Sequence, residues 1–171
     1  MPVVYSMIIL GHIYANDGST HKARKIVEEA FTIARQIDAR WMFANLRVQL
    51  GDIAAREMDW DAAGALYCEA LQHTSAAANQ TSMGHAVLKY TALLSARGEH
   101  RGAVRLLGAL SRIGNEFDRG LSREVGALVV NEQRVMDAAR EALGDDAFAD
   151  AWAEGESMTI AQASAEILEA R

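Results

Sequence analysis

The chain has 171 residues, of which half are apolar and only 6% aromatic, enough for one domain with a sizeable core. Its net charge of −6 argues against general affinity for nucleic acid, and no apolar run approaches the roughly 18 residues that span a bilayer. A single proline, Pro2, predicts an all-α fold, and a single cysteine, Cys68, excludes an internal disulfide and favours a cytoplasmic protein.

Three stretches of the chain, beginning at residues 10, 50 and 90, align with one another at a constant offset of 40 residues. Each has apolar residues at helical spacing, then a short polar break, then a second amphipathic segment. The second segments open near Ser19, Asp59 and Glu99, and serine and aspartate are good helix caps. The pattern predicts three antiparallel helical hairpins over residues 1–115.

Two glycines occupy equivalent positions in the first helices of the first two hairpins, Gly11 and Gly51. A glycine inside a helix costs about 1 kcal/mol relative to alanine, so we expect a structural reason for it. We predict that both lie where two helices cross closely, facing Ala23 and Ala63 of the partner helix. The third hairpin has Thr91 at this position, and its crossing is expected to be looser.

The segment "LGHIY", followed by a turn glycine at Gly18 and small residues at Ala23 and Ala30, resembles the tetratricopeptide repeat. This resemblance implies a right-handed α-solenoid of three such hairpins. The long second helices, "IVEEAFTIARQID" and "AVRLLGALSRIG", resemble the C-terminal repeat regions of large bacterial signalling proteins. Those proteins include LuxR-type regulators, regulators with signalling ATPase domains and adenylate-cyclase-like proteins. The likeness implies a regulatory region of a signalling or transcription-regulator protein.

The tail, residues 116–171, is predicted to cap the exposed apolar end of the array and to form one continuous domain with it. We expect a long helix over residues 121–143 and then a short helix that Gly155 ends. A capping box of Thr159 and Gln162 should open the last helix. The order of these elements also resembles the ends of the bacterial regulators.

Charge is distributed unevenly along the chain. Residues 89–123 hold seven Lys and Arg against three acids, whereas residues 137–171 hold two Arg against nine acids. Two interpretations are open. The charges are ordinary solvated faces, or they form a polar surface that docks against another domain or subunit.

The sequence lacks the patterns that catalytic and cofactor sites require. It contains no glycine-rich phosphate loop, and no two histidines are spaced three or four residues apart on a helix. Cys68 is expected to be a small buried residue and not a nucleophile. We therefore predict no enzymatic activity, no cofactor and no metal site.

The first helices of tetratricopeptide arrays line a concave groove, and the resemblance implies the same here. The polar residues it places on that side are Tyr5, His12, Asn16, Asn45, Gln49, Asp52, Arg56, His85 and Lys89. We predict a non-catalytic protein–protein interaction module that binds a peptide or protein in this groove. The alternatives are a bland solvated face and a small-molecule effector-sensing domain, with an enzyme the most distant.

The N-terminal segment is apolar and has no predicted cap. Something should cover its side chains Val3, Val4, Met7 and Ile8. A preceding domain or a second copy of the chain would do so. We expect a homodimer through this face and no binding to nucleic acid or membrane.

Overall fold

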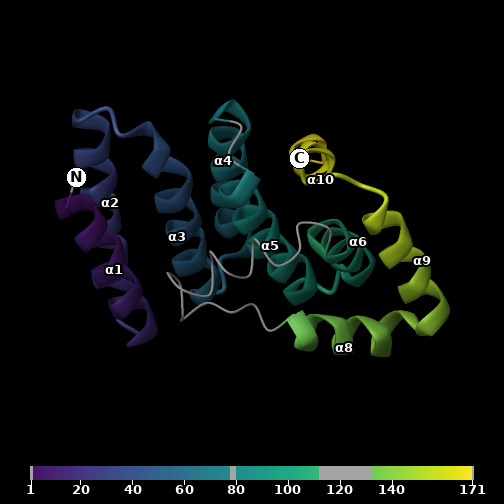
Figure 1. Cartoon of the computed structure of the whole chain (residues 1–171). Coiled ribbons are helices and arrows are strands. Elements are labelled where there is room, and N and C mark those ends of the chain that lie inside the picture. The colour runs from purple at the N-terminus through teal and green to yellow at the C-terminus, as the bar shows by residue number, and fades with distance from the viewer. Residues whose placement is uncertain (1, 78–79, 112–131, 171) are drawn as a thin grey trace. The chain divides into compact units, whose positions relative to one another are not determined.

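The computed structural model describes residues 2–77, 80–111 and 132–170, and every regular element within those ranges is a helix (Figure 1). The predicted all-α fold is confirmed. The chain divides into two compact units, Met1–Ala78 and Asn79–Arg171, called unit 1 and unit 2 below. The predicted boundary between hairpins and cap, and the start of the helix predicted at residue 121, lie outside the described residues.

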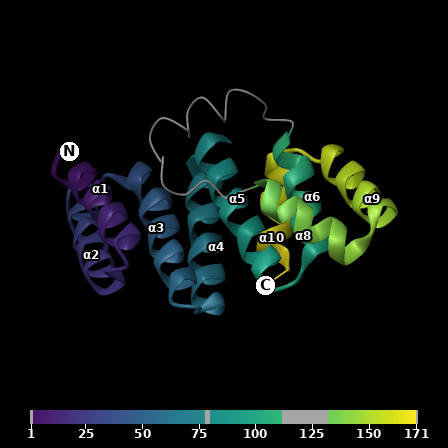
Figure 2. The ribbon, with the colours of Figure 1, turned by 90° about the horizontal axis from the view of Figure 1, so that it is seen from below.

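Unit 1 consists of two helical pairs joined by a short 3₁₀ turn. Its elements are α1 (Pro2–Asn16), α2 (Thr20–Gln36), η1 (Arg40–Met42), α3 (Phe43–Arg56) and α4 (Trp60–Ala77). Helix α1 packs on α2, α3 packs on α4, and both α1 and α2 contact α3, so the helices follow one another side by side (Figure 2). Buried apolar side chains from the helices fill the space between the pairs, among them Val4, Ile8, Val27, Leu46 and Ile53.

The turns within the helical pairs have the same backbone structure at positions 40 residues apart. At the end of the first helix, a backbone N–H donates to a carbonyl five residues earlier. These bonds join Ser19 to Tyr14, Asp59 to Ala54 and Glu99 to Leu94, at 2.8, 3.0 and 2.8 Å. The residue before each donor has a left-handed conformation, with φ of 80° at Gly18, 63° at Met58 and 79° at Gly98.

The glycines in α1 and α3 lie at close helix crossings, as predicted. A Cβ atom on Gly11 would lie 2.7 Å from Cγ2 of Val27, and one on Gly51 would lie 2.5 Å from Cε1 of Tyr67. Val27 and Tyr67 are themselves 40 residues apart. The predicted neighbours of these glycines, Ala23 and Ala63, are wrong. Both alanines lie one turn earlier in the partner helices, where they are fully buried.

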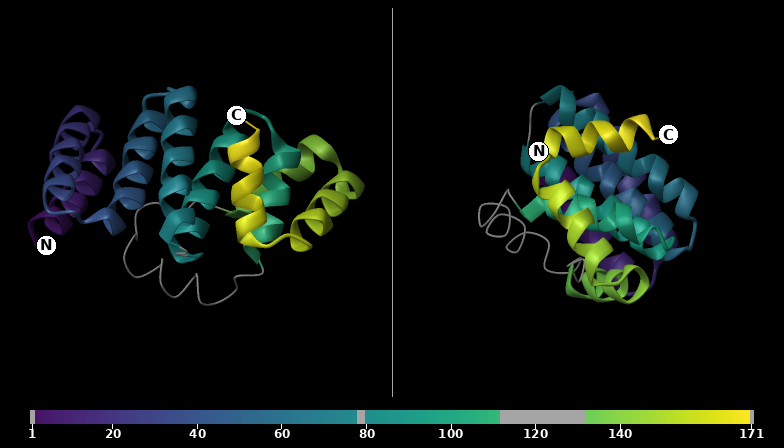
Figure 3. Two further views of the ribbon diagram at one scale, coloured as in Figure 1. Left: turned by 90° about the horizontal axis from the view of Figure 1, so that it is seen from above. Right: turned by 90° about the vertical axis from the view of Figure 1, so that its right-hand side faces the viewer.

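Unit 2 is arranged around α6. Its helices are α5 (Gln80–Ala96), α6 (His100–Ser111), α8 (Glu132–Leu143), α9 (Asp145–Glu156) and α10 (Ile160–Glu169). Helix α6 packs against α5, α8 and α9, and α10 lies against α5 and α6 (Figure 3). Thr91 in α5 is fully buried, and its hydroxyl donates to the carbonyl of Val87 at 2.9 Å. The looser crossing expected at Thr91 stays a prediction.

Gly155 does not end its helix, contrary to the sequence-based expectation. Helix α9 continues to Glu156, and Gly155 lies buried in its last turn. A Cβ atom there would collide with the carbonyl oxygen of Arg105 in α6, and one on Gly108 would lie 2.5 Å from the carbonyl oxygen of Trp152. The two glycines therefore allow α6 and α9 to cross backbone against backbone.

The capping box predicted for the last helix is confirmed. The backbone N–H of Gln162 donates to the hydroxyl of Thr159 at 3.2 Å, and the N–H of Thr159 donates to Oε1 of Gln162 at 2.8 Å. These two bonds satisfy donors that a helix start otherwise leaves unpaired.

Candidate interaction surface

Helices α1 and α3 each present a stripe of four side chains, and the two stripes match at an offset of 40 residues. The stripe of α1 consists of Tyr5, Ile9, His12 and Asn16, and that of α3 of Asn45, Gln49, Asp52 and Arg56. Within each stripe the spacing is four, three and four residues, which places the side chains along one face of a helix. The seven polar members are the unit 1 residues predicted for the groove.

Two hydrogen bonds tie the stripe of α3 to α1. The guanidinium of Arg56 donates through Nη2 to Oδ1 of Asn16 at 2.8 Å, and both side chains are exposed. The amide of Gln49 donates through Nε2 to the carbonyl of Ile8 at 2.8 Å, in a buried position. Asn16 and Arg56 occupy equivalent positions in the two helical pairs, so this bond connects the first pair to the second at matching positions.

Asp52 of α3 is hydrogen-bonded to a residue of α4. The hydroxyl of Tyr67 donates to Oδ1 of Asp52 at 2.8 Å, and both residues are buried. Burial, followed by the charge on Asp52, raises the pKa of Tyr67, so its hydroxyl stays protonated and remains a donor. Gln49 and Asp52 are therefore buried residues whose hydrogen bonds connect the helices of unit 1.

The exposed polar side chains of the stripes lie at their ends, and the apolar Ile9 between them is also exposed. Tyr5, Asn16, Asn45 and Arg56 are exposed, and His12 is half-buried. The remaining two predicted groove residues, His85 and Lys89, lie in α5 of unit 2, where both are buried. The exposed polar side chains of the two stripes therefore define the candidate interaction surface: Tyr5, Asn16, Asn45 and Arg56.

The residues predicted to mediate self-association divide between two faces of α1. Val4 and Ile8 are buried in the core of unit 1, and Met7 is partly buried against it. Of the four, only Val3 is well exposed. This is a correction: the exposed apolar side chains of α1 are Val3, Ile9, Leu10 and Ile13, alongside Tyr5. Because α1 is apolar on every side, its sequence does not indicate which face is buried.

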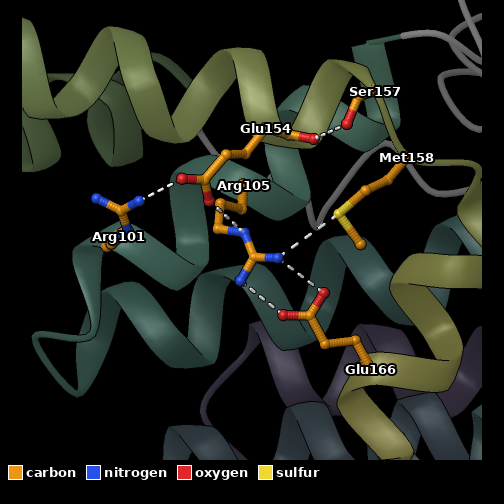
Figure 4. A network of polar contacts seen from close by, with 6 residues as sticks. All are labelled: Arg101, Arg105, Glu154, Ser157, Met158 and Glu166. Carbon is orange, nitrogen blue, oxygen red and sulfur yellow. Dashed lines mark hydrogen bonds and ion pairs between the residues drawn. The ribbon is translucent and has the colours of Figure 1, made fainter.

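Two arginines of the basic segment pair with two glutamates of the acidic tail inside unit 2. Arg105 of α6 donates to both carboxylate oxygens of Glu166 in α10, at 2.7 and 3.1 Å, and pairs through Nε with Glu154 of α9 at 3.1 Å (Figure 4). Arg101 pairs with the second oxygen of Glu154. Within the described residues, part of the basic segment thus pairs with part of the acidic tail, a contact that neither interpretation of the sequence included.

A second group of polar and aromatic side chains connects α2, α3 and α4. No pattern in the sequence indicates this group. The guanidinium of Arg47 lies 4.3 Å from the centre of the Phe31 ring and pairs with Glu69 at 2.9 Å. The ring of Phe43 lies 4.9 Å from Phe31 and 5.5 Å from His73. Partial burial, and secondly the charge of Arg47, lowers the pKa of His73. The contacts within this group stabilise the packing of the two helical pairs.

Among the described residues, no three His, Cys, Asp or Glu side chains are placed so that they could hold a metal ion. None of the helices in those ranges combines the length and the apolar character needed to cross a membrane. Cys68 is buried, as predicted.

The sequence matches no family model, no curated protein and no solved structure. The likeness to the tetratricopeptide repeat and to bacterial regulators therefore rests on the residues quoted above.

Proposed function

We propose that the chain is a non-catalytic protein-interaction module, and that its partner lies along the exposed ends of the α1 and α3 stripes. One observation carries this proposal. The two equivalent stripes are joined by the bond between Arg56 and Asn16, and they leave Tyr5 and Asn45 exposed on the same face. Tyrosine and arginine are enriched at protein interfaces, where they contribute much of the binding energy.

The chemistry of this surface fits an extended peptide with an acidic side chain. A guanidinium has five N–H donors, so its bond to Asn16 leaves Arg56 able to pair with a carboxylate. The side-chain amides of Asn16 and Asn45 can each donate to and accept from a peptide backbone. The ring of Tyr5 offers an apolar contact at the other end of the stripe.

The repeat architecture and the class of protein are part of the same proposal. A right-handed solenoid of three tetratricopeptide-like hairpins is supported by the turn bonds and left-handed residues that recur every 40 residues. We place it in the cytoplasm as the regulatory region of a bacterial signalling or transcription-regulator protein, where it binds a protein and neither nucleic acid nor membrane. The small-molecule alternative has no observation of its own in its favour.

Selection of binding peptides from a random peptide display library tests the proposal without requiring a known partner. The immobilised protein is screened against the library, and the enriched peptides are synthesised. We expect enrichment of acidic sequences, with binding that weakens roughly tenfold or more in Arg56→Glu and in Tyr5→Ala. Lys25→Glu, on the exposed side of α2, is the matched control and should bind normally. No enrichment, or peptides that bind all three variants equally, would overturn the proposal.

A further inference from the structure

Helix α1 has apolar side chains on all sides, and only one side is buried in unit 1. Its fifteen residues include no Asp, Glu, Lys or Arg. The face with Val4 and Ile8 is buried in unit 1, whereas Val3, Leu10 and Ile13 are 60%, 36% and 55% exposed. A helix that is apolar all round is normally buried on all sides.

The exposed residues form a regular line along α1, which we call the outer seam: Val3, Ser6, Leu10 and Ile13. Their spacing of three, four and three residues is that of the contact line between two helices of a coiled coil. The one polar member is already satisfied, because the hydroxyl of Ser6 donates to the carbonyl of Pro2 at 3.0 Å. The outer seam can therefore be covered by apolar side chains at little polar cost.

The equivalent line in α3 shows what such a seam contacts. Forty residues on, its positions are Phe43, Leu46, Leu50 and Ile53. Leu46 and Ile53 are fully buried and Leu50 nearly so, in one cluster with the core residues of α1 and α2. In the second helical pair this face is thus the packing surface for other helices.

We propose that the outer seam of α1 packs against the outer seam of a second copy of the chain, antiparallel and about a two-fold axis. Because α1 has no charged side chain, the two copies meet without like charges opposed, despite a net charge of −6 for each chain. A two-fold contact covers both seams at once and closes with two copies, whereas a head-to-tail contact would leave a seam exposed at one end of every open assembly.

This pairing places Val3 opposite Ile13 of the partner subunit, and Ser6 opposite Leu10 of the partner subunit. It does not depend on the proposed peptide surface, whose residues lie on a neighbouring face of α1 and on α3. Arg56→Glu should therefore leave the dimer intact, so failure of one proposal does not imply failure of the other.

Sedimentation analysis over a range of protein concentrations tests the pairing. The mass should rise from 18.6 kDa toward twice that value, and Ile13→Glu should shift the midpoint to a concentration roughly tenfold or more higher. The matched control is Ile37→Glu, because Ile37 is 46% exposed and lies outside α1. A chain that stays monomeric at all concentrations, or an equal shift in Ile37→Glu, would overturn the proposal.

A charge-pair variant tests the antiparallel geometry. In the double variant Val3→Lys/Ile13→Glu, each new lysine would face a glutamate of the other copy, and the dimer should form at lower concentration than in Ile13→Glu alone. In a parallel pair like charges would face each other and the double variant would not recover, which would contradict the geometry. Both positions are exposed, and circular dichroism verifies that every variant is folded.

Discussion

Gly51 of α3 lies directly against the ring of Tyr67 in α4, so that a Cβ atom on the glycine would come within 2.5 Å of Cε1. Gly11 has the same relationship to Val27, 40 residues earlier in both helices. The glycine is kept at a cost in helix propensity because it lets the two helices approach each other. The ring it contacts is fixed in turn by its hydrogen bond to Asp52.

Gly51→Ala should destabilise the protein by about 1–3 kcal/mol, even though alanine favours a helix by about 1 kcal/mol. The tethered ring of Tyr67 cannot move aside without stretching its bond to Asp52. Urea unfolding followed by circular dichroism measures the change. Gly102→Ala is the control, because a Cβ atom there meets only the flexible end of Leu94 at 3.1 Å. Equal effects of the two substitutions would contradict this account of Gly51.

Met58→Gly should stabilise the protein by about 1 kcal/mol. Met58 has a φ of 63°, a conformation that costs a non-glycine residue about 1–2 kcal/mol, and the equivalent Gly18 and Gly98 avoid this cost. Its side chain is 68% exposed, so little packing is lost. Thermal or urea unfolding measures the gain, and Gly18→Ala should give the opposite sign. A loss of stability in Met58→Gly would show that the side chain contributes more than its conformation costs.

Tyr67→Phe should destabilise the protein by about 1–3 kcal/mol, because it removes a donor from a buried carboxylate and keeps the ring. The wild type should also lose stability as pH rises. The folded pKa of Tyr67 is raised above its ordinary value of 10.0, so above pH 10 only the unfolded chain releases this proton.

Unfolding measured between pH 8 and 11 should therefore show stability falling more steeply for the wild type than for Tyr67→Phe. The exposed Tyr5 supplies the matched control, since Tyr5→Phe should retain the wild-type slope and stability. Parallel slopes for wild type and Tyr67→Phe would argue that the hydroxyl is not buried against Asp52.

Glu166→Gln should destabilise the protein by about 0.5–1 kcal/mol, because it weakens a two-bond contact with Arg105 that is still partly exposed. The effect should shrink at high salt, which screens the charged pair but not the packing of α10. Glu169→Gln, exposed near the end of the same helix, should change little. Unfolding at low and high salt tests both variants, and an unchanged difference at high salt would contradict an ionic origin.

The sequence predicts the features of this fold that depend on local patterns. Apolar spacing predicted the helices, Gly18 marked a turn that proves to be left-handed, and Thr159 with Gln162 marked a capping box. It could not predict contacts between distant residues. Arg105 and Glu166 are 61 residues apart, and no local signal connects them.

The sequence also could not indicate which of the polar groove residues have partners inside the protein. Of the residues predicted for the groove, Arg56 and the other polar ends of the stripes are exposed, whereas Gln49 and Asp52 lie buried in contacts with Ile8 and Tyr67. Polarity indicates a side chain that needs a partner, and the partner here is inside the protein. In α1, which has apolar side chains on every side, the buried Val4 differs from the exposed Val3 through the positions of the helices that pack against α1, which the sequence of α1 does not contain.

Hydrogen–deuterium exchange with a selected peptide tests the central claim that this chain recognises a partner through α1 and α3. The claim predicts that saturating peptide slows exchange in Pro2–Asn16 and Phe43–Arg56, and that Arg56→Glu abolishes this protection at the same peptide concentration. Protection confined to other helices, or unchanged in Arg56→Glu, would contradict it.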